Sequence, residues 1–379
     1  MSELLLPIFV AFGVTYFSIP AIISIADKKN LFDAPCPRKL HSGNIASLGG
    51  LGIFAGFALA LLLSTNFSKA IEFQYFVAAA LVILFVGVKD DMLSLSPLKK
   101  LMGQLIACFF VVHMAGLEIN NMFGFFGVYQ LPTLAAQLLT YFTMMLIINA
   151  FNLIDGVDGL AASIGLIASL VLGGFFLSVG HIPLATVAFS LAGSVSAFLF
   201  FNFPPAKIFM GDSGSMLIGL VCSLLIIKFI NAAPLSKSVQ ILAPPAVAIG
   251  ILIIPLLDTL RVFSVRLLSG KSPFGADRSH VHHILLDKGY SHQKTTLILV
   301  AASLFFIVFS FFAQYLGNGW LVAINGSMFF GSLWLLKRGN AWFSSLVLKK
   351  FWLKLVTSEK SLIDYQVSRR DTKVETGVY

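Results

Sequence analysis

Residues 149–162 place amide and carboxylate side chains at the end of a strongly apolar segment. Four such residues recur at every third position: Asn149, Asn152, Asp155 and Asp158. In an α-helix of about 3.6 residues per turn each such step lags the last by about 60°, so the four side chains converge on one ligand only if the helix breaks among them. Gly156 and Gly159 allow this break, because glycine tolerates backbone angles that other residues resist. We predict a helix end, a polar turn and then a new helix.

A pair of adjacent carboxylates, Asp90 and Asp91, follows the apolar run at residues 72–89. At the C-terminus of a helix they would lie at the negative end of its dipole, where anions are disfavoured unless a cation compensates. A metal ion would serve and would make the pair part of a site. A lysine would also serve and would leave only an exposed salt bridge. The nearby lysines are Lys89, Lys99 and Lys100.

Residues 202–215 form a second polar segment between two apolar runs. Its candidate site residues are Asn202, Lys207 and Asp212. We expect Ser213 or Ser215 to cap the helix that follows, whose free amide groups would attract phosphate. A carboxylate beside those amides, at Asp212, suggests a metal shared with that phosphate. In the alternative interpretation, Asp212 is itself the N-cap and the glycines form a tight turn.

Basic and imidazole side chains gather in two further predicted loops. Those in residues 26–46 are Arg38, Lys39 and His41, and those in residues 263–294 are Arg278, His280, His282 and His283. Such donors suit phosphate groups. Each loop also has a simpler interpretation: the charges of the first could serve only to orient the protein in the membrane, and the second could be a plain basic loop at the membrane interface. Three histidines in four residues could bind zinc, but no Cys and no His-Glu-x-x-His pattern accompanies them.

Three further features have simple structural interpretations. The Gly49-Gly50 pair after the first loop could let two helices pack closely. Asp258 and Arg261, three residues apart near the end of an apolar run, could pair with each other. The three cysteines are far apart and predict neither a disulfide framework nor a Cys-based metal site.

The composition is that of a polytopic membrane protein, with 58% of residues apolar and 11% charged. Apolar runs of about 20 residues are what a hydrocarbon core about 30 Å thick requires. The predicted fold class is all-α, with a transmembrane domain at residues 1–336 and a polar, basic cytoplasmic tail at 337–379 that is partly an interfacial helix or disordered. About eleven spans are predicted, at residues 4–25, 47–65, 72–89, 99–116, 133–151, 160–179, 184–201, 214–231, 240–262, 295–315 and 318–336.

Lys and Arg residues are distributed unequally among the predicted loops. The first lysine pair follows the first span, which predicts an N-terminus outside the cell. If the spans alternate, all of the 26 Lys and Arg residues except Lys69, Lys228 and Lys237 fall on one side. By the positive-inside rule that side is cytoplasmic. The net charge of +9 follows from this rule and from contact with anionic lipid, so no nucleic-acid partner is indicated.

The candidate carboxylates, amides and cationic groups all map to this cytoplasmic face. Carboxylate and amide oxygens suit Mg²⁺, which keeps waters and phosphate oxygens as further ligands. The residues therefore predict a site for a magnesium-bound diphosphate next to lipid, and phosphoryl transfer between a soluble nucleotide and a membrane-held acceptor. The competing class is a multi-pass transporter. Transporter sites, however, usually lie near the midplane of repeated, broken helices, and no repeat is visible here.

Four motifs together resemble the signature of the polyprenyl-phosphate N-acetylhexosamine-1-phosphate transferases of glycosyltransferase family 4. They are Asp90-Asp91, Asn149-x-x-Asn152-x-x-Asp155-Gly-x-Asp158-Gly-Leu-Ala, Asn202-Phe-x-Pro-Ala-Lys207-Ile-Phe-x-Gly-Asp212-x-Gly-Ser and Asp277-Arg278-x-His280-x-His282-His283. The resemblance implies a bacterial plasma (inner) membrane enzyme that moves a sugar 1-phosphate from a UDP-N-acetylhexosamine to undecaprenyl phosphate and releases UMP. Such a reaction initiates cell-surface polysaccharide synthesis. The resemblance also implies ten or eleven spans and a requirement for Mg²⁺, with Mn²⁺ as an alternative.

Details of the motifs are similar to the WecA/TagO branch, which uses UDP-N-acetylglucosamine. These details are the spacing His280-x-His282-His283, the segment Arg38-Lys39-x-His41 and the Gly49-Gly50 pair. The MraY branch, which transfers phospho-MurNAc-pentapeptide, tends to carry an uninterrupted His triplet and is the alternative function. One departure is Ala46, where relatives commonly have proline. The sequence leaves the oligomeric state open, with a homodimer among the alternatives.

The resemblance also implies roles for the candidate residues. Asn152 and Asp212 would hold Mg²⁺, and Asp90 or Asp91 would orient or deprotonate the lipid phosphate. Asp155 and Asp158 would bind the nucleotide or position donors. The transferring phosphates would be clamped by His280, His282, His283, Arg278 and Lys207. The remaining substrate-binding candidates are Arg38, Lys39, His41, Asn149 and Asn202.

Overall fold

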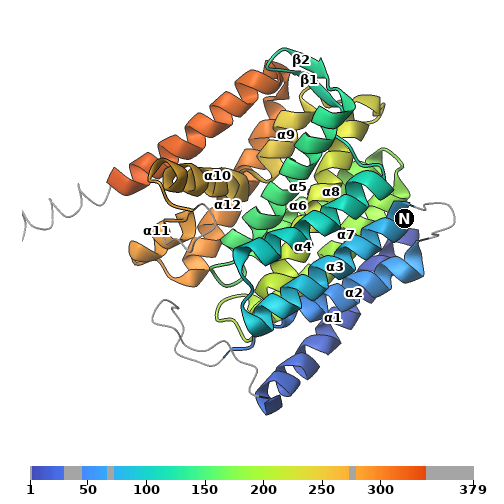
Figure 1. The fold of residues 1–379 in the computed structure, drawn as a ribbon, viewed down its shortest axis with the longest axis vertical. Coiled ribbons are helices and arrows are strands. Elements are labelled where there is room, and N and C mark those ends of the chain that lie inside the picture. The colour runs from blue at the N-terminus through green and yellow to red at the C-terminus, as the bar shows by residue number, and fades with distance from the viewer. Residues whose placement is uncertain (1, 30–44, 66–71, 273–278, 339–379) are drawn as a thin grey trace, which may run out of the picture. The chain divides into compact units, whose positions relative to one another are not determined.

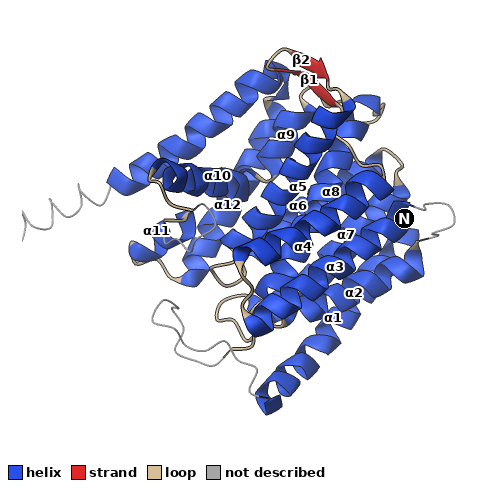
Figure 2. Ribbon diagram, in the orientation of Figure 1, coloured by secondary structure: helices blue, strands red, loops and turns tan. Residues whose placement is uncertain are grey.

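The computed structural model describes residues 2–29, 45–65, 72–272 and 279–338. The chain divides into two compact units, Met1–Gly326 and Ser327–Tyr379. All of the candidate site residues lie in the first unit. Of the predicted tail, only residues 337 and 338 are described, and they end the last helix. The described chain is almost entirely helical (Figures 1 and 2).

The helices follow the predicted apolar runs closely. In chain order they are α1 (Ser2–Lys29), α2 (Gly49–Ser64), α3 (Glu72–Leu93), α4 (Pro97–Phe109), α5 (Thr133–Ile154), α6 (Leu160–Ser178), α7 (Ile182–Asn202), α8 (Gly211–Ala232), α9 (Pro244–Ile251), α10 (Ile253–Leu268), α11 (Val281–Asp287) and α12 (His292–Phe312). Short π- or 3₁₀-helical turns occur at η1 (Phe110–Met114), η2 (Ala233–Leu235) and η3 (Gln314–Leu316). Together with η3, the last helix covers Gln314–Arg338.

Within the described residues, seven helices are long and apolar enough to cross a bilayer. The α9–α10 pair would make an eighth span, although the chain bends by 85° between the two helices. The predicted continuous span at 240–262 is therefore divided, and α10 crosses the direction of its neighbours (Figure 1). Helix α2 is apolar but shorter. This set of helices is that of a polytopic helical membrane protein.

Helix α8 is the most enclosed of the seven, and it contacts α2, α3, α5 and α6. Glycines allow its first turn to approach two of these neighbours. A Cβ atom added at Gly50 of α2 would lie 2.2 Å from the backbone nitrogen of Gly214, and one at Gly87 of α3 would lie 2.3 Å from Cα of Ser213. No side chain fits in either place. The prediction that the Gly49-Gly50 pair permits close helix packing is confirmed.

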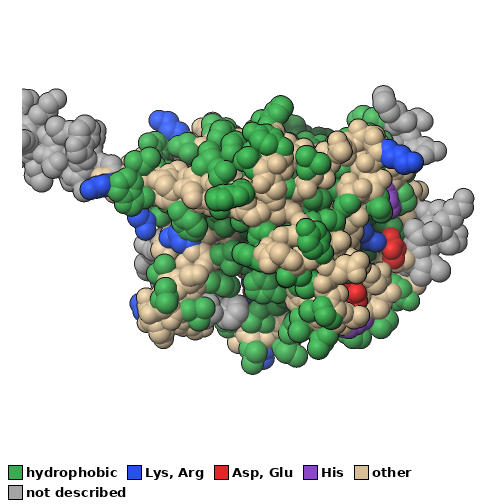
Figure 3. Space-filling model, turned by 90° about the horizontal axis from the view of Figure 1, so that it is seen from above, with side chains coloured by type: hydrophobic (Ala, Val, Ile, Leu, Met, Phe, Trp, Pro, Cys, Tyr) green, Lys and Arg blue, Asp and Glu red, His purple; other side chains and the backbone are tan. Residues whose placement is uncertain are grey.

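Strands β1 (Asn121–Phe125) and β2 (Val128–Gln130) form a small antiparallel hairpin, an exception to the predicted all-α fold. The hairpin directly precedes α5, whose other end carries the polar turn, so hairpin and turn lie at opposite ends of this helix (Figure 1). Figure 3 shows one face of the molecule, on which hydrophobic side chains are common and charged ones sparse. Such a surface suits contact with lipid.

Candidate functional site

The polar turn lies where the spacing of its residues predicts it. Helix α5 ends at Ile154, residues 155–159 form the turn, and α6 begins at Leu160. Gly159 has φ of +72°, a left-handed conformation that glycine adopts without a steric penalty. The predicted helix break is therefore confirmed, and it turns the side chains after α5 toward a common cavity.

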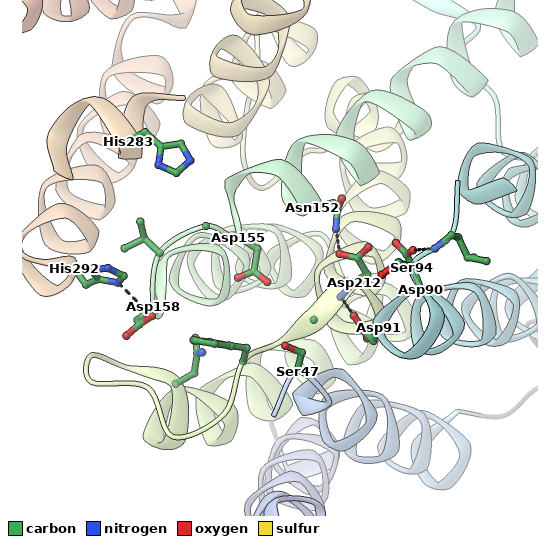
Figure 4. A pocket seen from close by; sticks show the side chains of 16 residues that line it. Ser47, Asp90, Asp91, Ser94, Asn152, Asp155, Asp158, Asp212, His283 and His292 are labelled. Carbon is green, nitrogen blue, oxygen red and sulfur yellow. Dashed lines mark hydrogen bonds and ion pairs between the residues drawn. The ribbon is translucent and has the colours of Figure 1, made fainter. Parts of the chain in front are cut away.

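A cavity of about 470 Å³ opens beside this turn, a size in the range of ligand sites. Its lining combines carboxylates from α3, the polar turn and α8 with side chains from α11 and α12 (Figure 4). The predicted site residues that line it are Asp90, Asp91, Asn152, Asp155, Asp158, Asn202, Asp212 and His283. Lining residues without a predicted role include Ser47, Ser94 and His292.

A lysine ammonium group lies among the carboxylates at one side of the cavity. Lys100 Nζ is 3.2 Å from Asp90 Oδ2 and donates a hydrogen bond of 2.9 Å to Asn152 Oδ1. It also contacts Asp212 Oδ2. Asn152 Nδ2 in turn donates to Asp212 Oδ1 at 2.6 Å. Of the three lysines considered as compensating cations, Lys100 is the one that compensates these carboxylates. It belongs to the site, although it is not among the predicted site residues.

Asp91 turns away from Lys100 and binds the start of α8. Its Oδ1 accepts a hydrogen bond of 2.6 Å from the backbone N–H of Asp212. Its Oδ2 accepts from the backbone N–H of Ser213 at 3.2 Å and from the Ser213 hydroxyl at 2.8 Å. The prediction that Ser213, Ser215 or Asp212 caps this helix is wrong, because α8 begins at Gly211 and its amides are satisfied by a carboxylate from α3.

Asp158 and Asn202 join the polar turn to the segment between α7 and α8. Asn202 Oδ1 accepts from the backbone N–H of Gly159 at 2.9 Å, and its Nδ2 donates to the carbonyl of Ile208 at 2.9 Å. Asp158 Oδ2 accepts from the backbone N–H of Ala206 at 3.1 Å. Both side chains are buried, so each holds two chain segments in register.

Two of the three predicted histidines are buried and do not line the cavity. His280 Nδ1 lies 2.9 Å from Asp258 Oδ2, and Arg261 donates to Asp258 Oδ1 at 2.7 Å, which confirms the predicted Asp258–Arg261 pair. The rings of His280 and His282 are stacked and only 4% and 1% exposed. Of the three predicted histidines, only His283 lines the cavity.

One titratable group on the polar turn and one on α11 have strongly shifted pKa values. Burial raises the pKa of the Asp155 carboxyl well above its usual value, and the nearby carboxylates of Asp212, Asp91 and Asp158 raise it further. Burial, together with the imidazoles of His283 and His280, lowers the pKa of His282 to about 3. His282 is therefore neutral near pH 7 and cannot act as a cation toward phosphate.

The donor set at Lys100 also bears on metal binding. Among the described residues, no three His, Cys, Asp or Glu side chains are grouped as a site built from these residues alone would require. Asp90, Asn152 and Asp212 nevertheless direct oxygen atoms at one cationic group. Hard oxygen donors of this kind suit Mg²⁺, which needs only one or two protein ligands beside substrate phosphates. The residues present therefore fit this metal.

Asn149 and Lys207 are not among the residues that line the cavity. Asn149 donates to Gln104 Oε1 at 2.8 Å and to the carbonyl of Met145 at 2.7 Å, so it joins α5 to α4. Lys207 is exposed on the segment before α8 and is not part of the described cavity lining. Four predicted residues lie outside the described residues: Arg38, Lys39, His41 and Arg278.

Comparison with known proteins gives consistent matches. The model of glycosyl transferase family 4 matches residues 73–230. The decaprenyl-phosphate N-acetylglucosaminephosphotransferase of Mycolicibacterium smegmatis is 33% identical, over 79% of this chain and 79% of that protein. The undecaprenyl-phosphate alpha-N-acetylglucosaminyl 1-phosphate transferase of Yersinia pestis is 30% identical, over 80% and 82%. A probable undecaprenyl-phosphate N-acetylglucosaminyl 1-phosphate transferase of Bacillus subtilis is 33% identical, over 81% and 85%.

Proposed function

This chain belongs to glycosyl transferase family 4, and from that membership we propose that it transfers N-acetylglucosamine 1-phosphate from a UDP-sugar to undecaprenyl phosphate, with release of UMP. The observation that carries the proposal is the meeting of Asp90, Asn152 and Asp212 around one cationic group at the cavity. The names of the three relatives support N-acetylglucosamine over the MurNAc-pentapeptide alternative and over a transporter.

In this proposal Asn152 and Asp212 hold Mg²⁺, or Mn²⁺ in its place, on the diphosphate of the donor. The metal would neutralise negative charge as the bond to UMP breaks. Lys100 adds a fixed positive charge on the same side of the cavity, beside Asp90 and Asp212. Two phosphate-bearing substrates bring several negative charges together, so this charge lowers the cost of their approach.

Of the two adjacent carboxylates, Asp90 is better placed to act on the lipid phosphate. Asp91 already accepts hydrogen bonds from the first turn of α8. Asp90 lies at the cavity, where its carboxylate is beside Lys100 and accepts a hydrogen bond of 2.5 Å from the backbone N–H of Leu95. Because the second ionisation of a phosphate monoester lies near pH 6, Asp90 needs to orient the lipid phosphate more than to deprotonate it.

The other side of the cavity would take the nucleotide and its phosphates. Asp155, Asp158 and His283 line this side. Lys207 and Arg278 remain proposed contacts of the transferring phosphates. His280 and His282 would act indirectly, because their burial keeps them from direct contact with a ligand in the cavity. Arg38, Lys39 and His41 remain proposed substrate contacts.

The proposal includes the membrane arrangement predicted by the charge distribution. It has eleven spans, an N-terminus outside, the cavity on the cytoplasmic side and a location in the bacterial plasma membrane. The unequal distribution of Lys and Arg supports this orientation. A cytoplasmic cavity would be open to the soluble UDP-sugar while the polyprenyl chain stays in the bilayer.

The test is to incubate the detergent-extracted protein with undecaprenyl phosphate, Mg²⁺ and a panel of UDP-sugars, and to measure UMP release. We expect release with UDP-N-acetylglucosamine, loss of turnover in Asp212→Asn, and normal turnover in the control Asp27→Asn, whose residue is exposed on α1. Release only with UDP-MurNAc-pentapeptide would establish the other branch. Solute flux into sealed vesicles without any UMP would establish a transporter instead.

A further inference from the structure

A histidine outside the four recognised motifs lies in the wall of the cavity. His292 is the first residue of α12, directly after Ser291, whose side chain caps this helix. Its Nδ1 atom is 3.3 Å from Asp158 Oδ1, within ion-pair distance but outside hydrogen-bond geometry, and the two side chains are 19% and 4% exposed (Figure 4). The two residues are far apart in sequence, so only the packing of α12 beside the polar turn brings them together.

Helix α12 holds Asp158 at a second point. The hydroxyl of Thr296, one turn after His292, donates a hydrogen bond of 2.8 Å to the backbone carbonyl of Asp158. Thr296 is fully buried. The same helix therefore contacts both the carboxylate and the main chain of Asp158, which restricts the rotation of this side chain as well as the path of the turn.

The opposite side of Asp158 is held by another segment. Its Oδ2 accepts a hydrogen bond from the backbone of Ala206, in the connection between α7 and α8. The two oxygens of one buried carboxylate thus face different parts of the chain, α12 and this connection. A buried carboxylate takes the orientation that its polar neighbours impose, because losing one of them leaves it poorly solvated. His292 is the side-chain partner in this arrangement.

We propose that His292 is a positioning residue for the transfer reaction, acting by holding Asp158 in place. Through Asp158 it fixes the turn at residues 155–159, and this turn carries Asp155 at the cavity and directly follows the end of α5 that bears Asn152. The inference rests on the proposed function. A displacement of about 1 Å at a reacting group can reduce a rate up to about 100-fold, so small movements of this turn matter.

A purely structural role for His292 would have a different signature. It would lower the melting temperature or the yield of folded protein, while each folded molecule kept its normal kcat. A positioning role lowers kcat in folded protein, and the loss is partly restored by a residue that can still place a polar nitrogen beside Asp158 Oδ1. His292→Gln can place an amide nitrogen there, whereas His292→Ala cannot.

The experiment measures kcat and KM for UDP-N-acetylglucosamine in four variants of the full chain. Each kcat is calculated per molecule of folded protein, as quantified by size-exclusion chromatography. We expect His292→Ala to lower kcat up to about 100-fold with a smaller change in KM, and His292→Gln to recover part of this loss. Thr296→Val, which removes the second contact, should lower kcat in the same direction. Gln293→Ala is the matched control, because this neighbouring side chain is exposed, and it should behave as wild type.

Normal kcat in folded His292→Ala would overturn the inference, and so would equal losses in His292→Ala and His292→Gln. A second measurement does not depend on turnover. The melting temperatures of His292→Ala, Asp158→Asn and the double variant should be non-additive, because residues in contact couple. Additive shifts would also overturn the inference. Absence of UMP from wild-type protein with every donor would instead reject the proposed function.

Discussion

The ammonium group of Lys100 contacts the carboxylate of Asp212, which lies more than a hundred residues later at the start of another helix. The contact belongs to a cluster in which Asp90 and Asn152 also face the lysine. Two carboxylates this close repel each other unless a cation lies between them. Lys100 supplies that cation, and it does so where the proposed metal would bind.

Replacing Lys100 by methionine should make the protein depend on a divalent cation for stability. Without the ammonium group, Asp90 and Asp212 face each other uncompensated, so we expect a lower melting temperature than wild type without metal. Added Mg²⁺ binds only the folded arrangement and should raise the melting temperature more in Lys100→Met than in wild type. Lys99→Met, on the same turn but exposed, is the control. Equal Mg²⁺-induced shifts in all three proteins would contradict the prediction.

Replacing Asp91 by alanine should destabilise the first turn of α8. Asp91 acts as its N-cap from another helix, and loss of a capping side chain costs about 1 kcal/mol. The melting temperature of Asp91→Ala should therefore fall, while Asp91→Asn, which keeps an acceptor oxygen, should fall less. Asp27→Ala removes an exposed helical carboxylate and serves as the control. The capping role is refuted if Asp91→Ala and Asp27→Ala melt at the same temperature.

Replacing Gly156 by alanine should disturb the contact between the polar turn and α11. A Cβ atom at this position would lie 2.5 Å from His282 Nε2, closer than such atoms approach. We expect a lower melting temperature and lower UMP release. Gly174→Ala, at an exposed helical position with nothing near the added atom, should instead be neutral or stabilise α6 by up to about 1 kcal/mol.

The steric cause of the Gly156→Ala effect can be separated from a backbone effect. His282→Ala removes the ring that the new methyl group would meet. If the contact is the cause, the double variant should lose less stability than the two single losses together predict. A backbone cause would leave the two losses additive, as measured by the melting temperatures of the four proteins.

His282 should make folding stability fall in mild acid. Its pKa is about 3 in the folded protein because the ring is buried beside two other imidazoles, whereas a histidine in an unfolded chain has a pKa of about 6.5. Below that value the unfolded chain binds a proton that the folded protein does not, so stability is lost as pH falls. The loss is on the order of 2 kcal/mol between about pH 6.5 and pH 5.

The measurement is the melting temperature as a function of pH, compared between wild type and His282→Gln. The variant lacks the titrating ring, so its melting temperature should decrease less between about pH 7 and pH 5. Parallel curves for the two proteins would show that His282 is not the group responsible.

Much of the site could be predicted from residue types and spacing. The three-residue repeat of Asn152, Asp155 and Asp158 requires a helix break for convergence, and Gly159 provides it with a positive φ. The oxygen donors of the proposed metal site are also visible along the chain. Local geometry decides the helix break, because the break depends on residues a few positions apart.

The partners of individual side chains could not be predicted in the same way. Lys100 and Lys99 are equivalent by composition, and only the rotation of α4 against α5 and α8 makes Lys100 the one that meets Asp212. Asp90 and Asp91 are adjacent, yet one faces the cavity lysine and the other caps α8. Neighbouring residues on a helix point about 100° apart, so their roles diverge once the helix is packed.

The sequence by itself determined that this protein is a helical membrane protein, where its polar turn lies, and which side chains are available for phosphate and metal chemistry. The tertiary structure alone decided that His280 and His282 are buried and do not line the cavity, that His292 lies in its wall beside Asp158, and that α9 and α10 bend apart. The physical reason is that apolar runs and glycines act on the chain locally. Contacts between distant residues arise from the packing of whole helices, which periodicity along one helix does not encode.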